Sequence, residues 1–380
     1  MSHEISMPPS KPLRRRHWIV RGALVAIFLV VACGFGASQV STGDYSVTPG
    51  GAEPVAPLIT IDGKQGTNNS GHILLTDVYL TPLSWLTYLP AWFNSDAEIV
   101  SGDALVTPGV SVNDLDIQGY LQMAQSKTNA QAAAFQRLGY PVTSTNDGAL
   151  VEAVGTSTPA SGRISVADIV VGVNGQATTT ACAVIAVTRN LLPGTTASFL
   201  IKKASISDNG TITNGSPVAV NVTVGKPPTA TQPSPCPGVS GAAKGFLGIA
   251  LQDDIHYVLP FSVNISTPNI GGPSAGLAMT LGIIDQLSNG TLIHHRTIGA
   301  TGTMSPSGAV GDVGGVPQKA VAVSNAGATM FLVPGTEKKA AQSTAASSLQ
   351  IVAVDTLNQA LKILMAGGGT ITMANGSIER

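Results

Sequence analysis

Apolar and polar positions follow two different periods along this chain, which predicts a mixed α/β protein. After residue 240, short apolar runs that suit strands alternate with stretches that suit helices. The expected strands are 246–251, 262–265, 329–333 and 350–354, and the expected helices follow Ser274 and cover 319–326, 337–346 and 357–364. Strands that alternate with helices predict an α/β unit. Its expected bounds are 240–367, with 368–380 as a frayed tail.

A second group of elements lies in the middle of the chain. Residues 114–138 have a helical pattern, and strand-like 149–154, helix-like 180–191 and strand-like 197–202 follow. This order predicts a β-rich unit over 113–205. Residues 39–112 are expected to be a connector that contains strands. Residues 206–239, with two Asn-Gly turns and a proline-rich run, are expected to be a linker.

An apolar stretch over residues 18–38 follows a cluster of arginines near the N-terminus. A membrane helix needs roughly 20 apolar residues. The arginines predict that residues 1–17 lie in the cytoplasm. Two other interpretations remain open: a cleaved signal peptide, and a lipoprotein-like cleavage site that makes Cys33 a lipid anchor. All three place the rest of the chain outside the cytoplasmic membrane.

Residues 83–93 are apolar and aromatic, but too short and too interrupted by proline to cross a bilayer. Two interpretations fit this segment equally well. Its aromatic side chains can lie at the membrane interface beside the anchor, or the segment can form a buried helix.

Composition and charge narrow the classes of function. Charged residues make up 11% of the chain and the formal net charge is −1, so nucleic acid is not an expected partner. No cysteine or histidine pair has metal-ligand spacing, and no phosphate-binding loop is present, so neither a metal nor another cofactor is expected. Apart from Cys33, only Cys182 and Cys236 can form a disulfide.

The strongest candidate chemistry is a serine and a lysine. Ser274 follows Gly271-Gly272-Pro273 at the start of an expected helix, and Lys319 lies among Gly, Val, Pro and Ala residues. A serine nucleophile needs an adjacent base, and a lysine can be that base only if its amine is neutral. Apolar surroundings lower a lysine pKa. The alternative is that Ser274 is only a polar residue in an ordinary strand-to-helix turn, and that Lys319 is a solvated lysine in the first turn of another helix.

The spacing of small residues around this pair resembles the proteolytic domain of the Lon family. Thr301-Gly302, Gly308-Ala309-Val310 and Gly314-Gly315 precede Lys319 in that order. The resemblance implies that Ser274 is the nucleophile, Lys319 the base, and Thr301 a contact of the lysine amine. The backbone N–H groups of Ser274 and Ala275 are expected to bind the oxyanion.

Two positions depart from that family pattern. Lon proteins commonly have an acidic residue where Gly271 stands, and a glutamate where Thr303 stands. These departures affect the surroundings of the expected dyad rather than the dyad itself.

The middle unit resembles a PDZ domain. The resemblance rests on residues 157–160, Val173-Asn174-Gly175 and Pro193-Gly194, whereas Ala167 stands where the family has glycine. It implies that an extended peptide binds by strand addition. The strand near 150–154 and the helix over 180–191 are expected to form the walls of that site.

Together these features resemble bacterial membrane-anchored Lon-like serine proteases with a PDZ domain. The expected fold is α/β (α+β) and multidomain, with an N-terminal transmembrane helix. The resemblance implies an ATP-independent endopeptidase with a Ser-Lys dyad, acting on peptides or unfolded proteins outside the bacterial cell membrane. A homo-oligomeric ring is a further expectation. The alternative function is a non-catalytic membrane-anchored PDZ scaffold whose Lon-like domain is structural.

Overall fold

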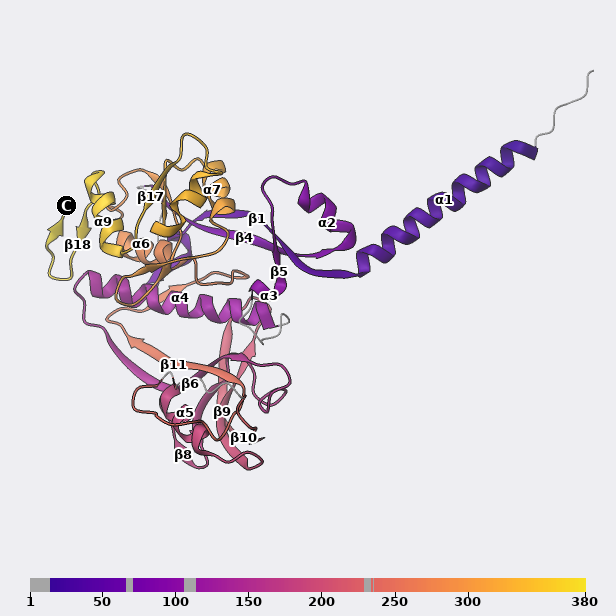
Figure 1. Cartoon of the computed structure of the whole chain (residues 1–380). Helices are drawn as coiled ribbons and strands as arrows, with labels where there is room; N and C mark the ends of the chain where they lie inside the picture. The colour runs from indigo at the N-terminus through magenta and orange to yellow at the C-terminus, as the bar shows by residue number, and fades with distance from the viewer. Residues whose placement is uncertain (1–13, 66–70, 106–113, 229–233, 235) are drawn as a thin grey trace, which may run out of the picture.

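The computed structural model describes residues 14–65, 71–105, 114–228, 234 and 236–380 (Figure 1). A body of two parts lies at one end of the molecule, and helix α1 (Arg14–Gln39) projects from it. Residues 21–39 of this helix are long and apolar enough to cross a membrane, with a mean hydropathy of 1.9. The mixed α/β class and the N-terminal apolar helix are therefore confirmed.

The upper part of the body in Figure 1 is built on a six-stranded sheet. Its strands, in spatial order, are β17 (Gln350–Ala353), β16 (Met330–Val333), β13 (Thr297–Ala300), β4 (His72–Ser84), β1 (Ser41–Pro54) and β5 (Glu98–Ser101). The first four run parallel, and β1 and β5 complete the sheet with antiparallel pairs. Of these parallel strands, β16 and β17 lie where the alternation after residue 240 predicts strands.

Two hydrophobic cores hold helices against this sheet. The larger core joins α4 (Leu115–Arg137), α6 (Gly276–Leu287) and α9 (Leu357–Ala366). Leu277, Leu281 and Ile284 of α6 are all buried in it, as their spacing predicts. A second core joins the sheet to α7 (Val316–Asn325) and α8 (Lys338–Gln342), which is shorter than the predicted helix.

The segment predicted to be a connector is instead part of this sheet. Strand β4 lies at its centre, β1 next to it and β5 at one edge, and the short helices α2 (Trp85–Trp92) and α3 (Gly102–Leu105) flank β5 in the chain. Helix α4, predicted to belong to the middle unit, packs against α6, and its Ala130, Ala133, Ala134 and Phe135 are buried in the larger core. Periodicity identifies the face that a segment buries, but not the unit against which it is buried.

Short elements close the rest of this part. They are the 3-10 turns η1 (Ala56–Leu58) and η3 (Gly335–Glu337), the three-stranded sheet of β2 (Ile59–Ile61), β3 (Lys64–Gln65) and β12 (Val263–Ile265), and the pair β14 (Thr303–Met304) and β15 (Val310–Gly311). The predicted tail is also ordered, because β18 (Ile371–Thr372) pairs with β19 (Ile378–Glu379) and Ile371 is fully buried.

The lower part of the body, over residues 143–258, is called the inserted unit below. Its strands, in spatial order, are β10 (Ile212–Thr223), β9 (Thr196–Ile206), β7 (Ile169–Val173), β6 (Thr143–Val154) and β11 (Ile249–Val258), with β8 (Gln176–Ala177) paired to β7. Helix α5 (Ala181–Asn190) packs against β6, β7 and β11. The chain enters this unit after α4 and leaves it before β12, so the larger unit is made from two separate segments.

Two predicted boundaries of the middle unit are therefore wrong. Residues 212–223 were expected in a linker but form an edge strand, because the Asn-Gly signals belong to the β9–β10 hairpin. Residues 249–258 were expected in the α/β unit but pair with β6. In the remaining linker, Cys236 forms a disulfide with Cys182 of α5.

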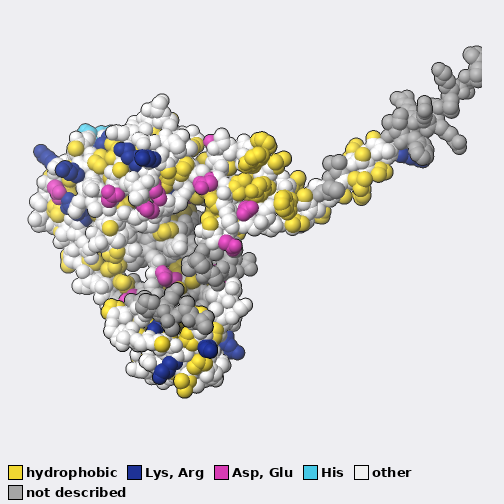
Figure 2. Space-filling view, viewed as in Figure 1, with side chains coloured by type: hydrophobic (Ala, Val, Ile, Leu, Met, Phe, Trp, Pro, Cys, Tyr) yellow, Lys and Arg dark blue, Asp and Glu magenta, His cyan; other side chains and the backbone are white. Residues whose placement is uncertain are grey.

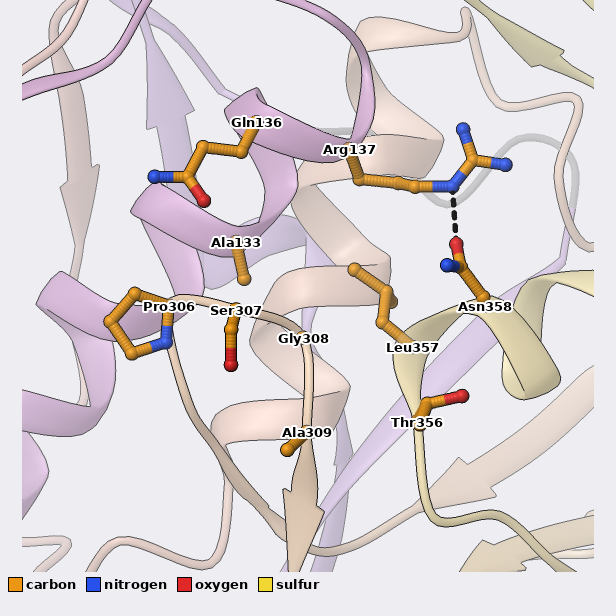
Figure 3. Close-up of a pocket in the computed structure, with 10 residues that line it drawn as sticks. All are labelled: Ala133, Gln136, Arg137, Pro306, Ser307, Gly308, Ala309, Thr356, Leu357 and Asn358. Carbon is orange, nitrogen blue, oxygen red and sulfur yellow. Dashed lines mark hydrogen bonds between the residues drawn. The ribbon is translucent and has the colours of Figure 1, made fainter.

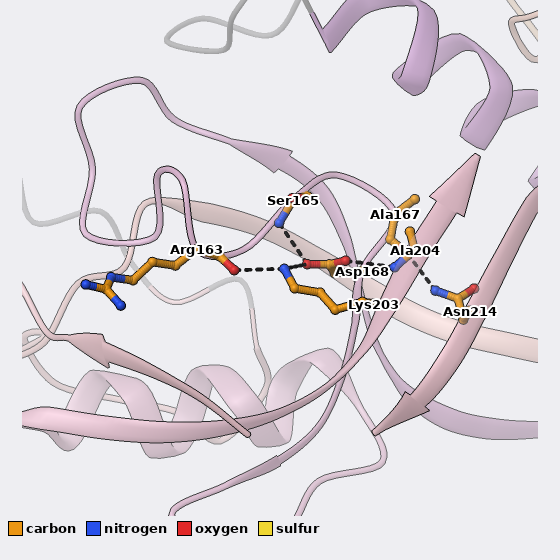
Figure 4. Close-up of polar contacts among 7 residues, drawn as sticks. All are labelled: Arg163, Ser165, Ala167, Asp168, Lys203, Ala204 and Asn214. Carbon is orange, nitrogen blue, oxygen red and sulfur yellow. Dashed lines mark hydrogen bonds and ion pairs between the residues drawn. The ribbon is translucent and has the colours of Figure 1, made fainter. Parts of the chain in front are cut away.

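A buried carboxylate holds one turn of the inserted unit (Figure 4). Asp168 is 1% exposed, and its oxygens accept hydrogen bonds from the backbone N–H groups of Ser165 and Ala204. Lys203 Nζ lies 2.7 Å from Asp168 Oδ2 and also donates to the carbonyl of Arg163. The preceding Ala167 has a left-handed backbone, with φ +69°, at the position where PDZ domains have glycine. This network fixes the turn that leads into β7.

Replacing Asp168 by alanine is expected to lower the free energy of unfolding by about 3 kcal/mol, because two backbone N–H groups lose a buried acceptor and Lys203 loses its partner. The measurement is urea unfolding of the full-length protein. Asp208→Ala, at an exposed aspartate in the same unit, is the control and should stay within about 0.5 kcal/mol. Equal effects of the two substitutions would contradict this role of Asp168.

Candidate active site

Ser274 and Lys319 line one cleft, which has a volume of about 760 Å³. Its walls come from β4, α4, the loop before α6 and the loop before α7. The carboxylates of Asp77, Glu98, Asp116 and Asp312 also lie along it. The structure thus brings together two residues that stand far apart in the sequence.

Ser274 lies in the turn that starts α6. Gly272, with φ +86°, gives the chain a conformation that other residues rarely adopt. The carbonyl of Pro273 accepts a hydrogen bond from Ser126 Oγ of α4, and that of Ser274 accepts one from the N–H of Gly302. The backbone of the serine is therefore held on two sides. Within the part of the chain that the structure describes, Ser274 Oγ has no hydrogen-bond partner.

Lys319 is buried in the second turn of α7, where only 2% of its surface is exposed. Burial lowers the pKa of its amine to about 8, against the opposing effect of the carboxylates of Glu337 and Asp77. A lysine with this pKa is partly neutral at pH 7 to 8, as a general base must be. Gly315 makes the close approach of α7 possible, because a Cβ there would lie 2.9 Å from Val78 Cγ1.

Thr301 connects the two candidate residues. Lys319 Nζ donates a hydrogen bond to Thr301 Oγ1 at 3.3 Å, and Thr301 Oγ1 donates one to the carbonyl of Ser274 at 3.2 Å. Thr301 is fully buried after β13, so this hydroxyl has few alternative partners. The contact between the threonine and the lysine amine is the one that the Lon resemblance implies.

The backbone donors beside Ser274 are available for a ligand. Helix α6 begins at Gly276, and its first N–H groups bond to the carbonyls of Pro273 and Gly302. Among the described residues, the N–H groups of Ser274 and Ala275 donate no hydrogen bond. Free donors at a helix N-terminus favour negative charge. These two groups therefore suit an oxyanion.

Glu337 is a residue of this site that the sequence did not single out. Its Oε1 accepts a hydrogen bond from the N–H of Val313, so it holds the loop that precedes Lys319. Its Oε2 is buried without a partner in the described part of the chain, and burial raises the pKa of this carboxyl. Glu337 lies in η3 after β16, and no nearby motif marks it.

The two departures from the Lon pattern have structural surroundings of their own. A Cβ at Gly271 would lie 3.1 to 3.2 Å from backbone atoms of Gly119, and the N–H of Gly272 donates to the carbonyl of Gly119. Helix α4 therefore occupies the space that an acidic side chain would need. Thr303 lies in β14, opposite Gly311 of β15.

A second cavity, of about 360 Å³, lies between α4, the loop over 306–309 and the start of α9 (Figure 3). Its longest polar side chain is already engaged. Arg137 Nε donates to Asn358 Oδ1 at 2.7 Å, and Arg137 Nη2 pairs with Glu379 Oε1. The candidate site is therefore assigned to the larger cleft.

Solved structures with local likeness to this chain include PDZ domains of SdrC-like proteins. That of Listeria monocytogenes is 16% identical, covers 28% of this chain and 90% of its own, and has a TM-score of 0.21. That of Listeria innocua is 20% identical, covers 29% and 97%, and has a TM-score of 0.20. Scores this low support no functional conclusion.

The C-terminal part of the chain has relatives among Lon proteases. Residues 249–367 match the family described as Lon protease (S16) C-terminal proteolytic domain. The Lon protease of Phenylobacterium zucineum is 39% identical over 83 residues, and that of Methylocella silvestris 38% over 86 residues. These matches cover 22% and 23% of this chain but only 10% of each relative. Within residues 249–367, this chain is therefore similar to the C-terminal proteolytic domain of Lon proteases.

Proposed function

We propose that this protein is an ATP-independent serine endopeptidase with a Ser274-Lys319 dyad. The observation that carries the proposal is the burial of Lys319, with its pKa lowered to about 8, in the cleft that Ser274 also lines. A lysine pKa near the working pH, in a cleft that a free serine hydroxyl also lines, is the combination that nucleophilic catalysis requires.

The proposed reaction has two halves. Ser274 Oγ attacks the scissile carbonyl while Lys319 Nζ takes its proton. The N–H groups of Ser274 and Ala275 stabilise the oxyanion of the tetrahedral intermediate. Lys319 then returns the proton to the leaving amine, and water hydrolyses the acyl-enzyme with Lys319 again as base. Thr301 keeps the lysine amine beside the serine backbone through its two hydrogen bonds.

Independence from ATP rests on the absence of a phosphate-binding loop in the sequence. Without an unfolding motor, the substrates would be peptides, exposed tails or proteins that are already unfolded. We place the reaction outside the cytoplasmic membrane, with α1 as an uncleaved anchor. The disulfide between Cys182 and Cys236 supports this location, since disulfides persist in oxidising compartments.

The inserted unit is proposed to capture extended substrate chains. The predicted wall at 150–154 cannot accept an added strand, because β6 already pairs with β7 and β11. Strand β11 is an edge strand of the described sheet, and it lies beside α5, where the N–H of Ala181 donates to Asp253 Oδ1. An edge strand next to a helix suits a peptide that binds as an extra strand. The chain of β11 continues through β12 towards Ser274.

The test is hydrolysis of an unfolded protein by the full-length chain in lipid nanodiscs, without nucleotide. Cleavage that a fluorophosphonate inhibits is the expected result. Binding of the same substrate without any cleavage would favour the non-catalytic scaffold. Cleavage that requires ATP would overturn the proposed independence.

A further inference from the structure

Helix α2 exposes most of its large apolar side chains. Trp85 is 64% exposed, Trp92 68%, and the following Phe93 75%. Leu86 and Leu89 are at least half exposed as well, and α2 has no buried residue. The sequence left open whether this segment is a buried helix, and that interpretation is wrong. Figure 2 shows the apolar side chains gathered on the extension between the body and α1.

The conformation of α2 does not depend on a covering partner. Ser84 caps the helix: its Oγ accepts a hydrogen bond from the N–H of Thr87, and Thr87 Oγ1 accepts one from the N–H of Ser84. Such a capping box satisfies two donors that a helix start leaves free. The helix is thus formed locally, while its apolar side chains remain in contact with solvent.

The start of helix α2 is hydrogen-bonded to the residue that follows α1. The N–H of Trp85 donates a hydrogen bond to the carbonyl of Val40, one residue after α1 ends, at 3.2 Å. In Figure 1, α2 lies beside the end of α1, between that helix and the body. The apolar surface of α1, which includes Leu24, Phe28 and Phe35, is exposed like that of α2. The two exposed surfaces therefore adjoin.

The composition of α2 suits the boundary between lipid and water. Residues 85–92 contain no charged side chain, and two of the eight are tryptophan and one is tyrosine. Tryptophan and tyrosine concentrate at membrane interfaces, because their rings are apolar and their N–H or O–H groups remain hydrated. Exposed apolar patches of this kind mark interaction sites.

We propose that α2 and Phe93 form a second membrane attachment, which inserts into the headgroup region of the leaflet where α1 ends. This inference rests on the proposed role of α1 as an anchor. A lipid surface is favoured over a second copy of the chain because α1 and α2 expose adjoining apolar surfaces, and one bilayer covers both. With two attachments, the body is held at a fixed orientation to the membrane rather than turning on a single helix.

The test uses the full-length protein in phosphatidylcholine vesicles. Trp18→Phe leaves Trp85 and Trp92 as the only tryptophans, since the chain has three. Lipids brominated near the headgroup should quench their fluorescence more strongly than lipids brominated at the bilayer centre, because an interfacial helix lies about 5 to 10 Å deep. Iodide in the water should quench them at least about threefold less than an exposed control tryptophan.

The matched control carries Ile378→Trp with the three native tryptophans replaced by phenylalanine. Ile378 is 60% exposed and lies in β19, in the part of the body remote from α1 in Figure 1. Iodide should quench this control strongly, and brominated lipids should not. If iodide quenches Trp85 and Trp92 as strongly as the control, the proposal fails.

Two further outcomes separate this proposal from its alternatives. Protection from both iodide and brominated lipids would show that a second copy covers α2, and would overturn the membrane assignment. An alkaline carbonate wash tests α1 independently. If the wash removes the protein from vesicles, the anchor fails and the α2 proposal fails with it. If the protein stays and α2 remains open to iodide, only the α2 proposal fails.

Discussion

Replacing Ser274 by alanine is expected to lower kcat for hydrolysis of an unfolded substrate by about 10⁴-fold or more. The alanine lacks the oxygen that would attack a carbonyl held by the free N–H groups of residues 274 and 275. Substrate binding should persist, because Ser274 Oγ holds no structural hydrogen bond among the described residues. The measurement is initial rates with the full-length protein, together with the substrate affinity.

The matched control is Ser307→Ala. Ser307 is another serine of the same unit, but it lines the smaller cavity rather than the cleft, and its Oγ contacts Ser305. Its loss should leave kcat unchanged. Hydrolysis that survives Ser274→Ala at the parent rate would refute the proposed nucleophile, whatever the control does.

Replacing Lys319 by methionine is expected to cost about 10³- to 10⁴-fold in kcat, because the serine loses its base. Methionine keeps much of the buried volume and removes a group whose charge is costly to bury, so the fold should persist. Because the two residues act as a unit, the double variant Ser274→Ala with Lys319→Met should be little worse than Ser274→Ala alone. Independent, multiplying effects would contradict a dyad.

The pH dependence of hydrolysis is a second test of Lys319 as the base. Only the neutral amine is a base, and with the pKa of Lys319 at about 8, roughly a tenth of it is neutral at pH 7. Hydrolysis should therefore rise with pH up to about 8 and level off above it. The carboxylate of Glu337 raises the pKa of Lys319, so Glu337→Gln should move this rise to lower pH while its amide oxygen still accepts from Val313. A rate independent of pH from 6 to 9 would argue against Lys319 as the base.

The sequence predicts individual elements well but not their partners. The helices after Ser274, at Lys319 and near the C-terminus all form; α7 and α9 bury one face, whereas α6 is buried on all sides from Gly276 to Asp285. Strand β4 pairs with β13, with Ile73 opposite Ile298. Nothing in the neighbouring sequence predicts this pairing, because a buried strand has the same apolar pattern in any sheet. The apolar segment that became α2 shows the same limit, because composition alone does not distinguish a buried helix from an exposed one.

The candidate site shows the same division. Ser274, Thr301 and Lys319 follow from motif spacing, and the structure places them in one connected group. Glu337 and Asp77 reach Lys319 only through the folding of the sheet, so no spacing within the chain indicates them.

The interleaved path of the chain also sets the order in which the molecule can be completed. During synthesis β1 and β4 emerge first, but β13, the parallel neighbour of β4, follows only after the whole inserted unit. Lys319 follows β13 in the chain, and until it is buried against the closed sheet its amine keeps an ordinary pKa of roughly 10.4 and its proton. A nascent chain, or one cut within the inserted unit before the sheet has closed, thus has no neutral lysine to act as a base. Under the proposed function, the connectivity of this fold keeps the enzyme inactive until its synthesis is complete.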